Sequence, residues 1–509
     1  MISPRYKYAV LSTVIFGIFS QGMGLFNKYS NHDDLQYFFT GGATFTSGRW
    51  MLYWTERLEK LFHGDGLFSL PVINGGITIL CLALVLCLLV DLFDLRSHAV
   101  ITALGGIMVS IPVVTCMFGY MFISHFFGIS LVLAVSGAYL ILKKDEWYFI
   151  AAGILLMTCS AGIYQAYIPT ILCVFLFGLI KQAYESDTRE KCIGLYKKTG
   201  IAVFSIVLFI AAYLFLMNIF LDRYGLQLSS YKGMNSYADV SLSEYSQRIL
   251  FAYKEFFAIP QQTTYYDVNL RPGIVLPLYL CLLAGFAVFY GVLACSRKKK
   301  TMSFCLLLGG LLTPMAVNFI FIMSDPETCY AMMLYGKAVF FVFGAWIVER
   351  GVEKISFKAS LILKRTFIVI MSMIVFAYAR FDNVCYLRMD LIQSQAIRYF
   401  TGLVTRIQST DGYNSFRYVS YINSPKPDFT DNSVNEISEF EKIRIPPYFD
   451  FLHTVGDSVW REFLRLWCGF SPHETDQSYF ENLPEVQGMP HYPDEGSIKV
   501  IDETVVVKF

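Results

Sequence analysis

Long apolar runs alternate with short polar segments over most of the chain before residue 381. About eleven of these runs approach the ~20 residues that a helix needs to cross the hydrocarbon core of a bilayer. They cover residues 8–26, 70–93, 99–118, 120–142, 147–161, 164–181, 199–221, 273–294, 302–323, 330–348 and 366–380. The pattern predicts an all-α polytopic membrane protein.

Two of these runs, 147–161 and 164–181, are short and meet at a break around Gly162. The break fits either a tight turn between two spans or a re-entrant corner. Two spans are the favoured interpretation, because backbone at the depth of the hydrocarbon core must find its hydrogen bonds within the protein.

Lysine and arginine are distributed unevenly over the two sets of loops. One set holds 19 of them, at positions within 5–7, 96, 143–144, 181–198, 297–300 and 350–365, whereas the opposite loops before residue 381 hold 9. The positive-inside rule therefore places the first set in the cytoplasm. The N-terminus is expected inside, as an uncleaved first span without an Ala-x-Ala site. The loops 27–69 and 222–271 and the whole tail are expected outside.

The segments predicted outside contain structure of their own. Loop 222–271 contains an amphipathic helix that Ser241 or Ser243 can cap. The tail 381–509 is richer in charge, Pro, Asn and Asp, and predicts a helix over 383–408, a strand over 416–422 and a hairpin through Asp502 and Glu503. We therefore expect a transmembrane domain over 1–380 with outer-face amphipathic helices, followed by a small extracytoplasmic α/β domain over 381–509.

Composition supports the membrane assignment and argues against some classes of binding partner. Of 509 residues 55% are hydrophobic and 16% charged, with a mean hydropathy of +0.48, whereas soluble domains carry about 25% charged residues. A net charge of +1 argues against a nucleic-acid partner. The 12 cysteines show no CxxC pair or His/Cys cluster typical of a metal site. Cys385 and Cys468 could form a disulfide in the tail, but spacing alone does not show their proximity.

Two adjacent acids, Asp33 and Asp34, follow the first apolar run. A carboxylate there can take the proton from an acceptor hydroxyl as that oxygen attacks an activated carbon. The alternative is a helix cap, where Asp is common. The order of the two acids does not decide which one would be the base.

Arg49 and Trp50 come next and open an amphipathic segment. Arginine is suited to bidentate contact with a phosphate, and its alternative role is interfacial, next to a belt of tryptophan. Apolar residues recur with helical spacing over 50–62. The segment therefore predicts a helix that lies on the membrane surface.

Five further candidates lie within or at the ends of predicted spans. Lys337 is inside an apolar run, where an ionisable residue usually faces a cavity or partner. His125 with Tyr120 before it, and Tyr164 with Gln165, stand at the outer ends of their spans. Each could instead be a core residue or an interface anchor.

The predicted position in the membrane strengthens the functional interpretation of all these residues. Counting the charges of the loops places them, together with Asp33 and Arg49, near the outer face. The sequence contains no P-loop, G-x-S-x-G or HExxH motif. A nucleotide-driven or hydrolytic soluble active site is therefore unsupported.

Several short motifs occur in an order that resembles a known family. They are N-x-DD at 31–34, GRW at 48–50, GYMF-x-x-H at 119–125 and G-x-YQAY at 162–167, followed by an outer domain that ends in a Val-rich strand. In this order the chain is similar to the Gtr type-II glucosyltransferases, integral-membrane enzymes of the GT-C class that modify O-antigen and other surface glycans. The similarity is strongest over residues 27–170.

The resemblance implies a GT-C-like fold, a polyprenyl-phosphate sugar as donor, with glucose expected, and a cell-surface glycan as acceptor. It also implies an essential acid in the first outer loop, which matches Asp33 and Asp34. Charge and depth assign Arg49 and Lys337 to the lipid phosphate. A single displacement would invert the anomeric centre. No cofactor is expected, and a divalent metal stays open.

Two other classes of protein fit the same composition. A lipid-linked sugar flippase or transporter would carry ionisable residues near the midplane and repeat symmetry, and no internal repeat is visible. A glycan polymerase or ligase would share the topology and the outer-loop chemistry. A structural membrane protein with an outer binding domain is the third alternative.

Overall fold

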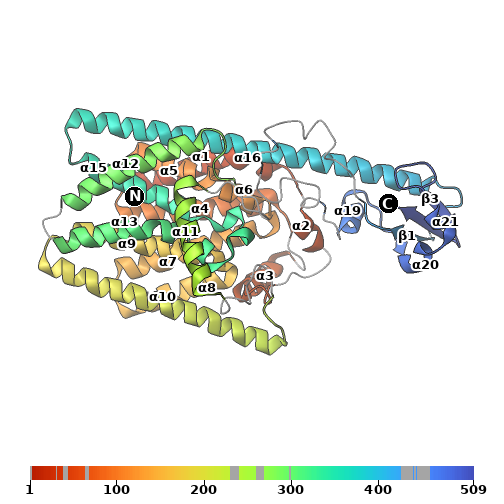
Figure 1. Ribbon diagram of the computed structural model, residues 1–509, viewed down its shortest axis with the longest axis horizontal. Coiled ribbons are helices and arrows are strands. Elements are labelled where there is room, and N and C mark those ends of the chain that lie inside the picture. The colour runs from red at the N-terminus through yellow and green to blue at the C-terminus, as the bar shows by residue number, and fades with distance from the viewer. Residues whose placement is uncertain are drawn as a thin grey trace. The chain divides into compact units, whose positions relative to one another are not determined.

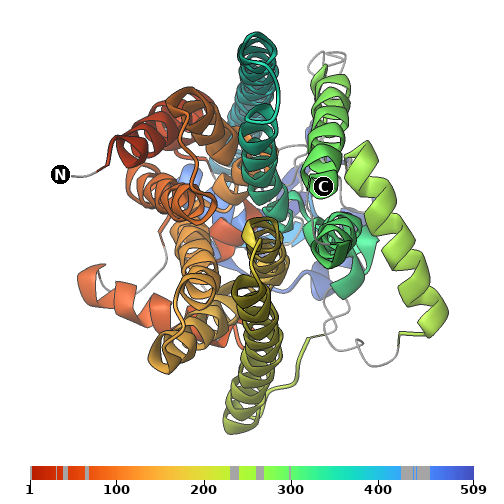
Figure 2. The same cartoon turned by 90° about the vertical axis from the view of Figure 1, so that its left-hand side faces the viewer.

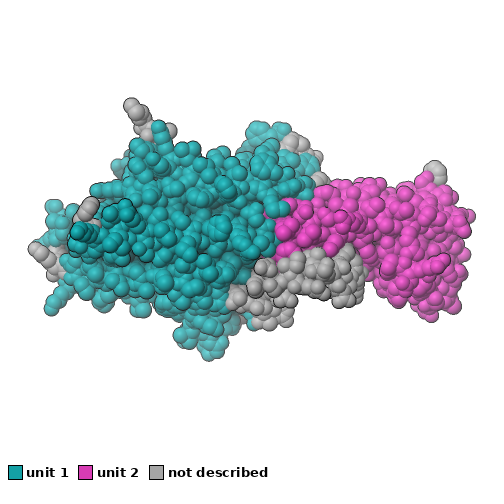
Figure 3. All heavy atoms as spheres, turned by 90° about the horizontal axis from the view of Figure 1, so that it is seen from above, with its two compact units in different colours: residues 1–28, 43–384, 444–446 teal, residues 29–42, 385–443, 447–509 magenta. Residues whose placement is uncertain are grey.

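The computed structural model divides into two compact units (Figure 3). Unit 1 comprises residues 1–28, 43–384 and 444–446, and unit 2 comprises 29–42, 385–443 and 447–509. The structure describes residues 3–29, 31–37, 44–63, 68–229, 240–259, 269–296, 300–415, 417–425, 440, 443, 455 and 459–509. The segment 29–42, expected in the membrane domain, thus belongs to the same unit as most of the tail.

Unit 1 is a bundle of helices, seen from the side in Figure 1 and along many of the helices in Figure 2. Its first half comprises α1 (Pro4–Phe26), α3 (Trp50–His63), η1 (Pro71–Gly75), α4 (Gly76–Phe93), α5 (His98–Ser110), α6 (Pro112–Phe118), η2 (Met121–Ile123), α7 (Ser124–Lys143), α8 (Trp147–Tyr164), η3 (Gln165–Tyr167) and α9 (Ile168–Glu185). Its second half comprises α10 (Arg189–Tyr224), α11 (Leu242–Ala258), α12 (Val275–Cys295), α13 (Lys300–Val317), α14 (Ile320–Met323), η5 (Pro326–Thr328), η6 (Ala331–Met333), α15 (Gly336–Val352) and the start of α16 (Phe357–Gln408).

Among the described residues, eight helical stretches are long and apolar enough to cross a membrane, or nine if the bent pair α5 and α6 forms one span. A helical membrane protein is therefore confirmed, whereas the number eleven stays a prediction. The predicted span 330–348 differs most, because 3₁₀ turns occupy its beginning and α15 has only 17 residues.

The bend between α5 and α6 measures 43° and has a local cause. Pro112 has no N–H to donate and forces the preceding residue, Ile111, into an extended conformation. The carbonyl of Val109, next to the break, accepts a hydrogen bond of 2.8 Å from the Gln21 side chain of α1. A buried glutamine thus satisfies backbone that the proline disrupts.

The stretch Trp147–Glu185 is continuous but turns at η3. Trp147 follows closely after α7, and Gln182 near the other end donates a hydrogen bond of 3.1 Å to the carbonyl of Leu142. Both ends therefore lie beside the end of α7, and the stretch contains both predicted short spans. The break falls at Gln165–Tyr167, whereas Gly162 lies inside α8.

Helix α16 joins two elements that the sequence predicts separately. The predicted span 366–380 and the predicted helix 383–408 are parts of one helix of 52 residues. Its residues up to Val384 belong to unit 1 and the remainder to unit 2. Helical backbone simply continues through the polar positions that interrupt the apolar run.

Unit 2 is a small α/β unit. It contains α2 (His32–Tyr37), the end of α16, β1 (Tyr418–Ile422), α19 (Trp460–Trp467), β2 (His473–Glu474), α20 (Gln477–Glu481), α21 (Pro484–Gln487), β3 (Ile498–Ile501) and β4 (Thr504–Lys508). The sheet order is β2-β1-β4-β3, with β1 parallel to both neighbours and β3 antiparallel to β4.

The predicted strand and hairpin of the tail are confirmed by β1, β3 and β4. The hairpin turns at Asp502 and Glu503, whose φ angles of 48° and 62° match the type of two-residue turn that joins twisted strands. Phe400 of α16 stacks on Trp460 in the core. Cys385 and Cys468 are not joined to each other, so the disulfide considered from the sequence is not formed.

Charged side chains are paired at the end of unit 1 where α1 begins and α4 ends, which we call the basic end. Arg5 contacts Asp91 at 2.8 Å, and Tyr139 donates a hydrogen bond of 2.7 Å to the same carboxylate. Arg350 of α15 contacts Asp94 at 3.2 Å. These contacts join α1, α4, α7 and α15.

Candidate active site

Helix α3 turns its two glutamates toward the protein and a stripe of apolar side chains away from it. Trp54, Leu58 and Phe62 are 45%, 59% and 83% exposed. On the opposite face the Glu59 side chain is only 16% exposed, and Glu56 is largely buried. The predicted amphipathic helix is present, and its exposed apolar stripe suits a membrane surface.

A left-handed glycine positions Arg49 just before α3. Gly48 has a φ of +72°, a conformation that side chains rarely adopt. The Tyr213 hydroxyl donates a hydrogen bond of 3.2 Å to the Gly48 carbonyl, which ties this turn to α10. The Arg49 guanidinium then lies 5.2 Å from the ring centre of Tyr164. Its Nε atom is buried and has no hydrogen-bond partner among the described residues.

Trp50 holds α3 against α8. Its ring is only 6% exposed and stacks on Phe220 with 5.8 Å between ring centres. A Cβ atom added to Gly162 would lie 2.6 Å from the Trp50 ring. The glycine predicted at a chain break therefore allows α3 to approach α8.

Two glutamates of α3 that were not selected from the sequence belong to this region, and one of them contacts His125. The Glu59 carboxylate contacts Nε2 of His125, at the start of α7, over 3.1 Å. Burial raises the pKa of Glu56 to about 7; the charges of Lys60 and Arg49 oppose this rise. Oε1 of Glu56 is buried and has no partner within the described part of the chain. The carboxylates could bind sugar hydroxyls or hold a proton.

One feature of the sequence could have pointed to these glutamates: they lie opposite the stripe of Trp54, Leu58 and Phe62 on the predicted helix. Periodicity shows that they share a face. It does not show whether that face meets protein or solvent, and their burial depends on α7 and α8.

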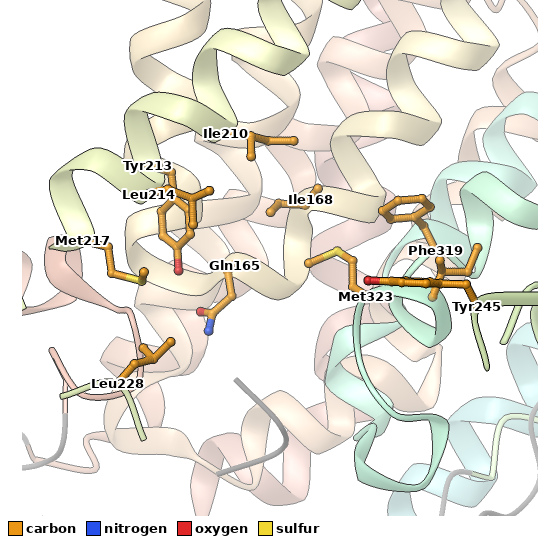
Figure 4. Close-up of a pocket in the computed structure, with 11 residues that line it drawn as sticks. Gln165, Ile168, Ile210, Tyr213, Leu214, Met217, Leu228, Tyr245, Phe319 and Met323 are labelled. Atoms are coloured by element: carbon orange, nitrogen blue, oxygen red, sulfur yellow. The ribbon is translucent and has the colours of Figure 1, made fainter. Parts of the chain in front are cut away.

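Gln165 connects this region to an apolar cavity (Figure 4). Its Nε2 atom donates a hydrogen bond of 3.0 Å to the carbonyl of Ser47. The cavity has a volume of about 310 Å³. It is lined by Gln165, Ile168, Ile210, Tyr213, Leu214, Met217, Leu228, Tyr245, Phe319, Ile322 and Met323.

Lys337 and Tyr120 occupy other places in unit 1. Lys337, at the start of α15, is 5% exposed, and its Nζ has no hydrogen-bond partner among the residues that the structure describes. Its ammonium lies 6.0 Å from the ring of Phe256 in α11. Burial raises the pKa of neighbouring Glu255, and the Lys337 charge opposes this rise.

Tyr120, 5% exposed, lies between α6 and η2.

Asp33 and Asp34 lie in the first turn of α2, in unit 2. The Asp34 N–H donates a hydrogen bond of 3.0 Å to the Asn31 side chain, and Asp33 contacts His32 at 3.3 Å. Acids in a first turn stabilise a helix, which fits the alternative to a catalytic role. Asp34 is only 1% exposed, and a role in capping the helix does not by itself require such complete burial. Catalysis by either acid stays a prediction, as does the predicted convergence with Arg49.

The described residues contain no group of three or more His, Cys, Asp or Glu side chains that could hold a metal ion. The described side chains around α3 include the Arg49 guanidinium, the Glu56 and Glu59 carboxylates and the His125 imidazole. They suit the binding of a polar, anionic or hydroxyl-rich ligand.

Comparison with known proteins identifies a family. The model of a family described as glucosyl transferase GtrII matches residues 22–345. No curated protein and no solved structure matches the chain. The matched region contains all nine candidate residues, from Asp33 to Lys337, and ends before the sheet of unit 2.

Proposed function

The chain belongs to the glucosyl transferase GtrII family and is a membrane glucosyltransferase, and we propose that it transfers glucose from a polyprenyl-phosphate donor to a cell-surface glycan. The observation that carries the choice of donor is the position of Arg49. Its guanidinium lies on Tyr164, and the next residue, Gln165, lines an apolar cavity. A donor that joins a phosphate to a long hydrocarbon chain fits both features.

Arg49 is the proposed contact for the donor phosphate. The Tyr164 ring orients the guanidinium without using its N–H groups. A planar guanidinium with available donors can bind two phosphate oxygens at once. Negative charge grows on this phosphate as the sugar leaves, so Arg49 stabilises the transition state more than the ground state. Lys337 is the second proposed cation.

Asp33 or Asp34 is the proposed general base. The carboxylate takes the proton of an acceptor hydroxyl while that oxygen attacks the anomeric carbon. The bond from this carbon to the phosphate oxygen breaks, and polyprenyl phosphate leaves. One displacement inverts the anomeric centre. In this proposal the carboxylate comes from α2, and the need for a divalent metal stays open.

The aromatic and polar neighbours of Arg49 are proposed to hold the sugar. Trp50 and Tyr164 offer ring faces for stacking. His125 and Gln165 offer hydrogen bonds to hydroxyl groups, and Tyr120 is included through its position near the start of α7. These contacts would orient the anomeric carbon toward the acceptor.

Purified full-length protein in nanodiscs, supplied with polyprenyl-phosphate glucose and a glycan acceptor, tests the function. Asp33→Asn or Asp34→Asn should reduce kcat by at least ~100-fold, the usual contribution of a general base. Asp222→Asn, at an exposed aspartate near the end of α10, is the matched control and should leave kcat unchanged.

A double variant, Asp33→Asn with Asp34→Asn, that keeps the wild-type rate would exclude the aspartate mechanism. Absence of transfer by the wild-type protein, together with movement of the lipid-linked sugar across proteoliposomes, would favour a flippase instead. Mass spectrometry of surface glycans from a deletion strain identifies the sugar, because a hexose and an N-acetylhexosamine differ in mass.

A further inference from the structure

We propose that the cavity of Figure 4 binds the hydrocarbon chain of the lipid-linked donor next to its phosphate, so that Leu214 and Met323 position the donor. This inference rests on the proposed function and adds the place of the chain. The cavity lies within unit 1, and its lining comes from η3, α9, α10, α11, α14 and the residues that adjoin them.

The lining suits a hydrocarbon chain. Leu214 and Met217 of α10 face Phe319 and Met323 across the cavity, and none of the described residues that line it is charged (Figure 4). Methionine side chains are flexible and polarisable, so they adapt to a branched chain. A volume of about 310 Å³ accommodates only part of a polyprenyl chain, and the remainder would extend into the lipid.

The cavity is directly linked to the residues that carry the phosphate contact. Tyr213 lines the cavity, and its hydroxyl donates the hydrogen bond of 3.2 Å to Gly48, the residue before Arg49. Gln165 also lines the cavity, and the preceding residue, Tyr164, supports the guanidinium. Two separate connections thus tie Arg49, which does not itself line the cavity, to the lining residues Tyr213 and Gln165.

The cavity also reaches the side of the protein that faces lipid. Leu214 lines it and is nevertheless 44% exposed. Its neighbours Val207 and Phe215 on α10 are 63% and 66% exposed. An apolar, largely uncovered transmembrane helix contacts lipid chains, so a chain can enter from the bilayer without crossing water.

A chain that leaves lipid for this cavity gains little from the hydrophobic effect, because lipid is as apolar as the lining. The cavity therefore acts by packing around the chain and by fixing the position of the phosphate. Filling it should raise KM for a long-chain donor and change little for a donor too short to reach it.

The test compares donors of two lengths on the full-length protein in nanodiscs. Leu214→Trp fills the cavity, and Val207→Trp adds the same side chain to an exposed position of the same helix. The donors are polyprenyl-phosphate glucose and an analogue whose phosphate carries a methyl group in place of the hydrocarbon chain. We expect Leu214→Trp to raise KM about tenfold for the long donor only, the effect of an overpacked site. Val207→Trp should match the wild type.

The outcomes separate the two proposals. Equal KM values of Leu214→Trp and the wild type for the long donor would overturn the cavity assignment while leaving the transferase intact. Loss of a bound phospholipid from Leu214→Trp, seen by native mass spectrometry without any chain-length effect, would assign the cavity to a structural lipid. No transfer from either donor by the wild type would contradict the proposed function itself. Met323→Trp replaces Leu214→Trp if the latter does not fold.

Discussion

The two ends of unit 1 differ in whether their charged side chains are paired. At the basic end Arg5 meets Asp91 at 2.8 Å and Arg350 meets Asp94 at 3.2 Å. At the opposite end Nε of Arg49, Oε1 of Glu56 and Nζ of Lys337 are buried without a hydrogen-bond partner among the described residues.

An unpaired buried polar group costs free energy that a fold would normally avoid. The paired charges join helices, so their loss should affect stability. The unpaired groups contribute little to the fold in this state, and binding of a polar ligand would offset their cost. Substitutions at the two ends should therefore produce different defects, and this difference can be measured.

The largest expected effect is that of Arg49→Ala. Removal of the guanidinium should reduce kcat by about 10²- to 10³-fold, because stabilisation of the developing phosphate charge is lost. Arg49→Lys should recover part of the rate, since an ammonium keeps the charge but not the planar pair of donors. Single-turnover transfer in nanodiscs measures the rate, and thermal unfolding measures the stability, which should change little.

Arg5→Ala is the matched change at the basic end. It leaves the largely shielded Asp91 carboxylate without one of its partners and should lower the unfolding temperature, while the rate per folded molecule stays near that of the wild type. If Arg5→Ala inactivates the folded protein, or if Arg49→Ala only destabilises it, the functional contrast between the two ends is wrong.

A smaller effect is expected from Glu59→Ala. The substitution removes the contact of 3.1 Å to His125, whose ring is 5% exposed. Loss of a buried partner should cost about 1–3 kcal/mol of stability and should reduce the transfer rate about tenfold through misplacement of the ring. Glu59→Gln keeps an acceptor and should retain most of both. Equal behaviour of the two variants would argue against a role for this contact.

The sequence predicted the parts of the protein that depend on local pattern. Apolar runs predicted the helices, and the alternation around Asp502 and Glu503 predicted the hairpin of β3 and β4. The helix α16 was predicted in two pieces because polar residues interrupt its apolar run. Buried Asp382, which bonds to Ser20 of α1, is one of them. Packing against another helix is not visible in the local pattern.

The candidate site was predicted unevenly for the same reason. Arg49, Tyr164 and Gln165 were selected from motifs at separate places in the chain, and the structure brings them together. Glu56 and Glu59 were missed because only tertiary contacts turn their face of α3 inward. The cavity could not be predicted, since its lining is assembled from segments between residues 165 and 323.

Glu56 predicts a pH dependence of stability. Its pKa is raised by burial from an ordinary value of 4.5 to about 7. Between these values the folded state binds more protons than the unfolded state, so stability falls as pH rises from about 4.5 to about 7. The full difference is of order 3 kcal/mol. Thermal unfolding across this window should show a decline that Glu56→Gln removes, and an unchanged decline in that variant would assign it to other groups.

The smallest effect is expected from Arg96→Ala at the basic end. Arg96 contacts Asp94 at 2.8 Å, but its side chain is 70% exposed, and exposed ion pairs contribute little to stability. The unfolding temperature should not change measurably. Glu349 is the informative comparison, because this 6% exposed carboxylate accepts hydrogen bonds from the backbone N–H groups of Arg96 and Ser97 at the start of α5.

Glu349→Ala should therefore lower the unfolding temperature by several degrees, since it leaves two N–H groups at a helix start without their acceptor. If Arg96→Ala is as destabilising as Glu349→Ala, then the contacts at the basic end stabilise the fold because they are paired, whether or not they are buried. The unpaired groups at the opposite end would in that case have to be explained by their surroundings, and the inference that they await a ligand would depend on Arg49→Ala alone.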